Sequence, residues 1–361
     1  MLARDVGAES AMRQKRGGRA AGVTMEDVAR VAGVSAMTVS RVLRQPALVN
    51  ADLKARVEAA IRETGYIYNL VASSLASQRS GIIALILPTV ASSIFTDSVK
   101  GVSDVARTHG VQMIMAETNY SPAEEEKVIE ALLRRRPDGF VIVGVSHTRT
   151  TRALLEKSGI PVVETWDSTQ TPIDSLVGLS NFDAMKAMTE ALVAQGFRRI
   201  AFVGAATRDR RAQMRAKGYE AAIAEAGLGA PLTLNADDLT SMESGRVIAE
   251  RVAAMQPRPD ALLCLNDVLA AGALLALQRM GLAVPGDIAV AGFGGLDFSS
   301  HLNPSLSTVD IPRYEMGQRA AEMLIGRIAG TAGAGGTCEV GYRIVLREST
   351  GGSRPAEATA S

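Results

Sequence analysis

The sequence predicts an α/β protein with a small all-helical N-terminal domain and a larger body in which parallel β-sheets form two subdomains. Its 361 residues are enough for two or three domains. Two short amphipathic segments joined by a glycine, within residues 24–45, are typical of a helix-turn-helix. From residue 81 onward, continuous apolar runs alternate with amphipathic stretches, which indicates repeated βαβ units.

The composition is that of a folded globular protein. Hydrophobic residues make up 47% of the chain and charged residues 21%, a balance that excludes wholesale disorder. Cys264 and Cys338 are too few for a disulfide framework, and they lack the spacing of a zinc site. No apolar run approaches the roughly 20 residues needed to cross a bilayer, and no apolar core of a secretory signal is present. We therefore expect a cytoplasmic protein that uses no metal and no cofactor.

Charge is distributed unevenly along the chain. Residues 1–80 carry 12 Lys and Arg against 7 Asp and Glu, a net charge of +5, whereas the remainder has a net charge of −4. A basic head on an acidic body suggests that the head binds a polyanion. A solvated charged tail is the alternative, and composition does not separate the two. Residues 1–22 are expected to be a disordered basic arm.

The head is predicted to contain three short helices. Thr24 is a plausible N-cap of the first helix, and Gly33 ends it. Ser35 caps a second helix that continues to Gln45, and Asn50 caps a third that ends at Gly65. The tight glycine turn between the first two makes residues 23–68 a helix-turn-helix domain.

The second helix of this motif carries the predicted DNA chemistry. Because Val39 and Val42 point into the small core, Ala36, Met37, Ser40 and Arg41 lie near the opposite side. The major groove exposes base acceptors and the thymine methyl, so a recognition helix needs short residues and a forked donor there. Arg41 suits guanine or phosphate, Thr38 and Ser40 suit phosphates, and Met37 suits apolar contact with a base. An ordinary three-helix bundle with a polar exterior remains the alternative.

Residues 23–43, VTMEDVARVAGVSAMTVSRVL, resemble the opening of the LacI/GalR family of bacterial transcription regulators, and residues 57–66 continue the match. The resemblance extends over residues 23–350. It implies a hinge helix at 69–76 that pairs across a dimer and inserts Leu75 into the minor groove, with Ala72 one turn earlier. Tyr68 departs from the family, which usually has proline there. The predicted DNA-binding residues are Thr24, Ser35, Ala36, Met37, Thr38, Ser40, Arg41, Arg44, Asn50, Asn69, Ala72 and Leu75.

Buried strands are predicted for the body. Apolar runs typical of strands that are covered on both faces lie at 82–87, 111–116, 140–143, 161–164, 200–203, 261–265 and 288–291. Amphipathic helical stretches lie at 98–109, 124–134 and 183–195. These units exceed one sheet, so two sheets with a cleft between them are expected. The resemblance implies a type I periplasmic-binding-protein-like body of two subdomains crossed by three strands.

The expected boundaries follow from these patterns. A hinge helix and linker take residues 69–80, an effector-binding and dimerisation domain takes 81–350, and a disordered tail takes 351–361. The first subdomain is expected at about 81–178 and 310–336, and the second at about 179–309 and 337–350. Because the tail lacks the tetramer-forming leucine repeat of the family, a homodimer is expected.

Ligands of such sheets bind beyond the carboxyl ends of the strands. Phe95 and His147 follow the first and third strands, although a core phenylalanine and a surface histidine are equally ordinary interpretations. Trp166 lies between acidic residues after the fourth strand, which favours a sugar-binding role, with core packing as the alternative. The predicted effector-binding residues are Phe95, His147, Glu164, Trp166, Asp167, Arg215, Asn266, Phe293 and Asp297.

The arginines of residues 208–215 are expected to face solvent, with the exception of Arg215. The resemblance aligns Arg215 with an effector-binding arginine of the family, and a guanidinium in a cleft suits a carboxylate. It likewise assigns Asn266 to the ligand, while Asp267 is expected to cap the next helix. The family's acid after Gly292-Phe293 is replaced by glycine, with Asp297 following later.

Residues 163–168 (VETWDS), together with His147-Thr148 and residues 293–297 (FGGLD), resemble the gluconate-repressor branch of the family. The resemblance implies a sugar-acid effector such as gluconate or 2-ketogluconate, whose carboxylate is held by Arg215 with a contribution from His147. The function expected is that of a DNA-binding repressor released from a palindromic operator by this effector. A regulator of a different sugar and a corepressor-dependent regulator are the alternatives within the family.

Two other classes of protein are also weighed. An enzyme is disfavoured because the chain has no Gly-x-Gly-x-x-Gly after the first strand, no Walker loop and no Gly-x-Ser-x-Gly elbow. A cytoplasmic or exported sugar-acid-binding protein shares the body but needs no helix-turn-helix. We therefore expect double-stranded DNA and a small effector as partners, and no membrane.

Overall fold

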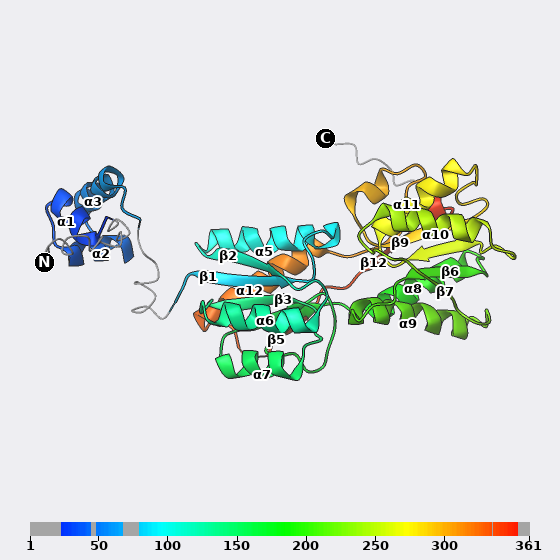
Figure 1. Cartoon of the computed structure of the whole chain (residues 1–361), viewed down its shortest axis with the longest axis horizontal. Helices are drawn as coiled ribbons and strands as arrows, with labels where there is room; N and C mark the ends of the chain where they lie inside the picture. The colour runs from blue at the N-terminus through cyan, green and yellow to red at the C-terminus, as the bar shows by residue number, and fades with distance from the viewer. Residues whose placement is uncertain (1–22, 45–47, 68–78, 334, 353–361) are drawn as a thin grey trace, which may run out of the picture. The chain divides into compact units, whose positions relative to one another are not determined.

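The computed structural model describes residues 23–44, 48–67, 79–333 and 335–352. The chain divides into two compact units, one ending at Gln78 and one beginning at Arg79 (Figure 1). The predicted basic arm at 1–22, the hinge residues Asn69, Ala72 and Leu75, the unusual Tyr68 and the tail from 353 onward lie outside the described residues.

The N-terminal unit has the three predicted helices: α1 (Met25–Ala32), α2 (Ala36–Arg44) and α3 (Ala51–Thr64). Thr24 and Asp27 form a capping box at the start of α1, and Gly33 ends that helix with φ 64°. The small hydrophobic core of this unit consists of Val28, Ala29, Ala32, Val39, Val42, Val57 and Ala60. The prediction of a helix-turn-helix is confirmed by this arrangement.

The first subdomain of the body contains a six-stranded sheet in the order β11-β5-β4-β3-β1-β2, and all its paired strands are parallel. Its strands are β1 (Ile82–Leu87), β2 (Gln112–Glu117), β3 (Gly139–Val143), β4 (Val162–Thr165), β5 (Ser175–Gly178) and β11 (Thr337–Glu339). Its helices are α5 (Thr96–Thr108), α6 (Pro122–Leu133), α7 (Arg149–Ser158) and α12 (Arg313–Ala329), and the short 3-10 helix η2 (Ser93–Phe95) precedes α5.

Both faces of this sheet are covered by helices (Figure 1). Along β1, Ile83 and Leu85 belong to the core that contains residues of α5 and α12. Ala84 and Ile86 point to the opposite face and join the core that contains residues of α6 and α7. This explains why β1 is apolar at every position, since successive side chains point to opposite faces.

The second subdomain has a six-stranded sheet in the order β12-β10-β9-β8-β6-β7. Its strands are β6 (Ile200–Gly204), β7 (Leu232–Asn235), β8 (Ala261–Cys264), β9 (Ala289–Gly294), β10 (Ser307–Asp310) and β12 (Arg343–Val345). Helices α8 (Asn181–Ala194) and α9 (Arg210–Glu225) pack against each other, as do α10 (Met242–Ala253) and α11 (Asp267–Arg279). The 3-10 helices η3 (Asp297–Ser300) and η4 (Glu348–Thr350) complete it, and only β12 is antiparallel to its neighbour.

Three segments join the subdomains. The chain leaves the first sheet after β5, returns after β10 into α12, and crosses again between β11 and β12. The expected third boundary at residue 336 is therefore early, because residues 337–339 pair with β5 as part of the first sheet. The two-subdomain α/β prediction is confirmed. No helix in the described parts of the chain is long and apolar enough to cross a membrane.

Candidate functional site

The outer side of α2 is a candidate nucleic-acid interface. Val39 and Val42 are buried, whereas Arg41 is exposed and Met37 is 75% exposed. Ala36 and Ser40 are half-buried on the same helix. A large apolar side chain beside an arginine on an exposed helix surface is suited to base contacts in the major groove.

The three predicted capping residues hold helix ends. Thr24 caps α1, and Asn50 accepts a hydrogen bond from the Asp52 amide at 2.8 Å at the start of α3. Ser35 Oγ accepts from the Thr38 amide at 3.2 Å and lies 2.9 Å from Thr38 Oγ1. These side chains therefore orient the motif, and their contact with DNA stays a prediction, as does that of Arg44.

A cleft in the body contains two adjoining hollows lined by residues from both subdomains. The larger hollow has a volume of about 70 Å³ and is lined by the loops after β1, β2 and β3 together with residues 208–211. The smaller has a volume of about 30 Å³ and is lined by Phe95, Arg215 and Asn266 among others. Tyr120, Asp209 and Arg211 line both hollows. The cleft lies at the carboxyl ends of the strands, as expected for such sheets.

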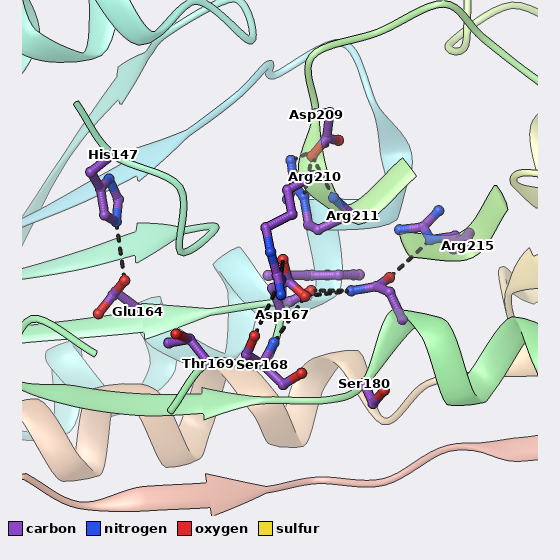
Figure 2. A network of polar contacts seen from close by, with 12 residues as sticks. His147, Glu164, Asp167, Ser168, Thr169, Ser180, Asp209, Arg210, Arg211 and Arg215 are labelled. Atoms are coloured by element: carbon purple, nitrogen blue, oxygen red, sulfur yellow. Dashed lines mark hydrogen bonds and ion pairs between the residues drawn. The ribbon is translucent and has the colours of Figure 1, made fainter. Parts of the chain in front are cut away.

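Arg215 reaches the smaller hollow from α9 (Figure 2) and makes no ion pair with a carboxylate of the residues that the structure describes. Its Nε donates to Asn181 Oδ1 at 2.9 Å, and its Nη1 donates to the Leu265 carbonyl at 2.9 Å. The guanidinium carbon lies 3.9 Å from the ring centroid of the buried Phe293. Burial lowers the pKa of Arg215 to about 10, which leaves the side chain charged at neutral pH. The result is a buried cation with two neutral oxygen partners and an aromatic face.

Arg211 is buried, contrary to the expectation that it faces solvent. Its side chain is 5% exposed, and Nε and Nη2 donate to the two oxygens of Asp209 at 2.9 and 3.1 Å. Burial alone would raise the pKa of Asp209, but the Arg211 guanidinium offsets burial and lowers it. Arg211 Nη1 is buried and has no hydrogen-bond partner among the described residues. This nitrogen is an unused donor on a residue that lines both hollows.

Arg210 and Asp167 join the two subdomains across the larger hollow. Arg210 Nη1 lies 2.5 Å from Asp167 Oδ2 and donates to the Ser168 carbonyl at 3.2 Å (Figure 2). Asp167 is buried after β4. The side-chain nitrogen Nδ2 of Asn181 donates to the carbonyl of the preceding Trp166 at 2.9 Å. Asp167 therefore lines the cleft as predicted, but an arginine of the protein already pairs with it.

His147 and Glu164 form a buried ion-pair network instead of lining the cleft. His147 Nδ1 lies 2.7 Å from Glu125 Oε1, and Nε2 lies 3.1 Å from Glu164 Oε1. Burial would lower the pKa of His147, but the two carboxylates raise it to about 9. Glu164 also accepts a hydrogen bond from the Ile173 amide at 2.5 Å. His147 lines neither hollow and both its ring nitrogens contact carboxylates of the protein, so its contact with an effector carboxylate stays a prediction that this arrangement does not support.

Trp166 fills the core, which was the alternative to its predicted place in the cleft. The side chain is 1% exposed, and its Nε1 donates to Ser98 Oγ at 3.2 Å. The ring meets Phe95 edge-to-face with centroids 5.1 Å apart. Phe95 in turn lines the smaller hollow, so Trp166 supports a wall of the cleft from behind.

The expected roles of Asn266 and Asp267 are partly reversed. Asn266 lines the smaller hollow, but its Oδ1 also caps α11 by accepting the Leu269 amide at 2.9 Å. Asp267 is buried, which raises its pKa, and it accepts hydrogen bonds from the Leu296 amide and from hydroxyls of β10 and η3. Asp297 is exposed and lines neither hollow.

Three residues that line both hollows were not predicted from the sequence: Tyr120, Asp209 and Arg211. Of these, only Asp209 has a recognisable sequence feature, because it is the residue before a helix.

Comparison with known proteins gives two family matches. Residues 24–69 match the family described as bacterial regulatory proteins, lacI family, and residues 189–350 match the periplasmic binding protein-like domain. The HTH-type transcriptional regulator GntR of Escherichia coli (strain K12) is 37% identical over 329 residues, which is 91% of this chain and 98% of that protein.

Solved structures give the same result over both units. A transcriptional regulator of the LacI family from Silicibacter pomeroyi superposes with a TM-score of 0.84 at 35% identity, covering 91% of this chain and 99% of the other. The lac repressor dimer bound to operator and the anti-inducer ONPF gives a TM-score of 0.79 at 28% identity, again covering 91% and 99%.

Proposed function

The chain belongs to the LacI family of bacterial regulatory proteins and is a DNA-binding transcriptional regulator, not an enzyme; from this premise we propose that it represses sugar-acid catabolism. Its effector is a sugar acid such as gluconate or 2-ketogluconate, bound in the cleft of the body. Effector binding releases a homodimer from a palindromic operator.

Arg215 is the observation that carries the proposal. Its guanidinium is buried at the wall of the smaller hollow and makes no ion pair with a carboxylate of the described residues, although the charges of Asp209 and Asp167 reach it. A buried charge is costly unless a charged or strongly polar group completes its shell. A carboxylate on a small ligand supplies that group through charge-assisted hydrogen bonds. Phe95 and Phe293 provide apolar surface beside Arg215, as the carbon backbone of a sugar acid requires.

Operator recognition is assigned to the exposed side of α2. Two copies of the motif read two half-sites, with Met37 and Arg41 toward the bases and phosphates. The predicted hinge residues Asn69, Ala72 and Leu75 act at the centre of the operator, where an inserted apolar side chain kinks the duplex.

Interactions between the subdomains link the cleft to the rest of the body. Arg210 pairs with Asp167, and Arg313 donates to Asp97 Oδ2 at 2.6 Å and to the Gly294 carbonyl. A ligand that binds one arrangement of the subdomains better than another shifts the population toward it. The effector therefore changes DNA affinity by stabilising one of two arrangements of the subdomains.

The test replaces Arg215 by methionine and compares it with Arg251→Met, an exposed position on α10. Titration calorimetry measures sugar-acid binding, and a DNA shift assay measures operator affinity. Loss of a charged hydrogen-bonding pair of about 1.5–3 kcal/mol predicts a ten- to hundredfold weaker effector in Arg215→Met alone. DNA affinity without effector should remain within about twofold in both variants. The proposal is wrong if sugar acids give no heat while a neutral hexose or a purine does.

A further inference from the structure

We propose that the larger hollow is a second oxyanion subsite, so that the natural effector carries an anionic group at each end. The ligand class is a sugar acid with a phosphate ester or a second carboxylate distant from the first. This inference rests on the proposed function, which places the first carboxylate at Arg215.

The first argument is the unused donor of Arg211. Asp209 occupies two nitrogens of this guanidinium, and Nη1 remains buried without a hydrogen-bond partner among the described residues. Leaving a buried donor unpaired costs roughly 1–3 kcal/mol, more for a charged group. Arg211 also lines the larger hollow, so an anion bound there lies beside this guanidinium.

The second argument is that two helix N-termini and three arginines border the larger hollow, although Asp209 caps one of these helices. Ser121 and Pro122 line it from the start of α6, which has 12 residues, and Asp209 and Arg210 line it from the start of α9, which has 16. Helix N-termini favour bound anions. Arg208 also lines the hollow, and its guanidinium makes no ion pair with a carboxylate of the described residues.

The third argument is that every carboxylate in the hollow already has a cationic partner. Asp167 pairs with Arg210, and Asp209 pairs with Arg211. Glu125 contacts His147, which its two carboxylate neighbours keep protonated at neutral pH. Two of the three carboxylates of the lining are therefore neutralised by one arginine each, and Glu125 shares the single charge of His147 with Glu164.

The two subsites adjoin each other, so that one ligand can occupy both. Arg211 and Arg215 are one turn apart on α9, and Tyr120 lines both hollows between the subdomains. Asn119 and Tyr120 both have left-handed backbone, with φ of 52° and 56°, which costs about 1–3 kcal/mol each and is typical of ligand clamps. A hollow of about 70 Å³ exceeds the roughly 10–15 Å³ needed by one water, and so has room for an oxyanion group.

The experiment measures binding to the full-length protein by titration calorimetry with gluconate, 6-phosphogluconate and glucarate as probes. The inference predicts that at least one dianion binds ten times more tightly than gluconate. If the second anionic group of the effector is a phosphate ester, 6-phosphogluconate should bind more tightly than glucarate. If it is a carboxylate, glucarate should bind more tightly.

The variant Arg211→Gln, with Arg251→Gln as its matched control, localises the effect. Because Arg211 lines both hollows, Arg211→Gln should weaken dianion binding more than gluconate binding, so that the ratio of the two affinities falls toward one, whereas Arg251→Gln should leave this ratio unchanged. Arg211→Lys serves as a second variant that retains the charge, and Trp166 fluorescence verifies that each variant is folded.

Each outcome decides one of the two claims. Gluconate binding that neither dianion improves overturns the second subsite and leaves the proposed function intact. A dianion advantage that survives in Arg211→Gln also overturns the assignment of the subsite. If no sugar acid binds, the proposed function itself fails.

Discussion

Replacing His147 by glutamine should remove a pH-dependent contribution to the stability of the body. His147 lies between Glu125 and Glu164, with its two ring nitrogens 2.7 and 3.1 Å from their carboxylate oxygens. The His147 side chain is 1% exposed, so solvent screens these interactions little. Glutamine has similar size and retains hydrogen bonding, but it carries no charge.

The magnitude follows from the pKa of His147, which the carboxylates raise from 6.5 to about 9. A group whose pKa is higher in the folded state stabilises the fold fully below its unfolded pKa, and this contribution disappears as pH rises through the folded pKa. A shift of roughly 2.5 units corresponds to about 3 kcal/mol. The free energy of unfolding of the wild type should therefore exceed that of His147→Gln by the largest amount at pH 6. This difference should shrink by about 3 kcal/mol by pH 10.

Urea unfolding followed by Trp166 fluorescence measures this difference, because Trp166 is the only tryptophan and is buried in the first subdomain. Unfolding free energies of both proteins are compared at several pH values, so that other titrating groups cancel. A difference that stays constant from pH 6 to pH 10, or grows as pH rises, would refute the charged His147 network.

Three further predictions concern other parts of the chain. Arg41→Ala should weaken operator binding by about 1–3 kcal/mol, measured by fluorescence anisotropy at several salt concentrations, and unchanged affinity would exclude Arg41 from the interface. Thr24→Ala removes the capping box of α1 and should cost the helical unit about 1 kcal/mol, whereas Thr24→Ser should not, as thermal unfolding by circular dichroism will show. Tyr219→Phe leaves the Leu232 amide, 2.9 Å from the phenol oxygen, without its acceptor and should lower the urea midpoint of the body by an amount equivalent to about 1–3 kcal/mol; an unchanged midpoint would mean that water replaces the phenol.

Elements buried on both faces were predictable from the sequence. β1 is apolar at each position because helices cover both sides of its sheet, and the three helices of the N-terminal unit have clear caps and glycine ends. β5, β7 and β10 were not predicted, since each has four residues and includes polar side chains. The short edge strands β11 and β12 carry too few residues to give a period.

Contacts between distant segments explain the errors in the predicted site. His147 is buried because it meets Glu125 and Glu164, 22 and 17 residues away, and no local pattern contains that meeting. A run of arginines in residues 208–215 is typical of an exposed helix. Arg211 is nevertheless buried, because it forms an ion pair with Asp209 at the cleft. Arg215 was assigned from a family resemblance, since spacing alone does not distinguish it from Arg211.

The cleft and the crossing segments share one hydrogen-bond network. Arg215 donates to Asn181, the first residue of α8 after the chain has crossed from β5. The side-chain nitrogen Nδ2 of Asn181 donates in turn to the carbonyl of Trp166 in the first subdomain. The backbone of Trp166 is left-handed, with φ of 70°. A ligand at Arg215 therefore contacts a group that already touches both subdomains.

The central claim is that a sugar acid bound in this cleft controls binding to DNA. A DNA shift titration on the upstream region of the protein's own gene, with and without gluconate and 2-ketogluconate, tests it most directly. We expect specific binding in the absence of ligand and release by one of the two sugar acids. Specific binding that neither sugar acid alters would mean that a sugar acid does not control this regulator.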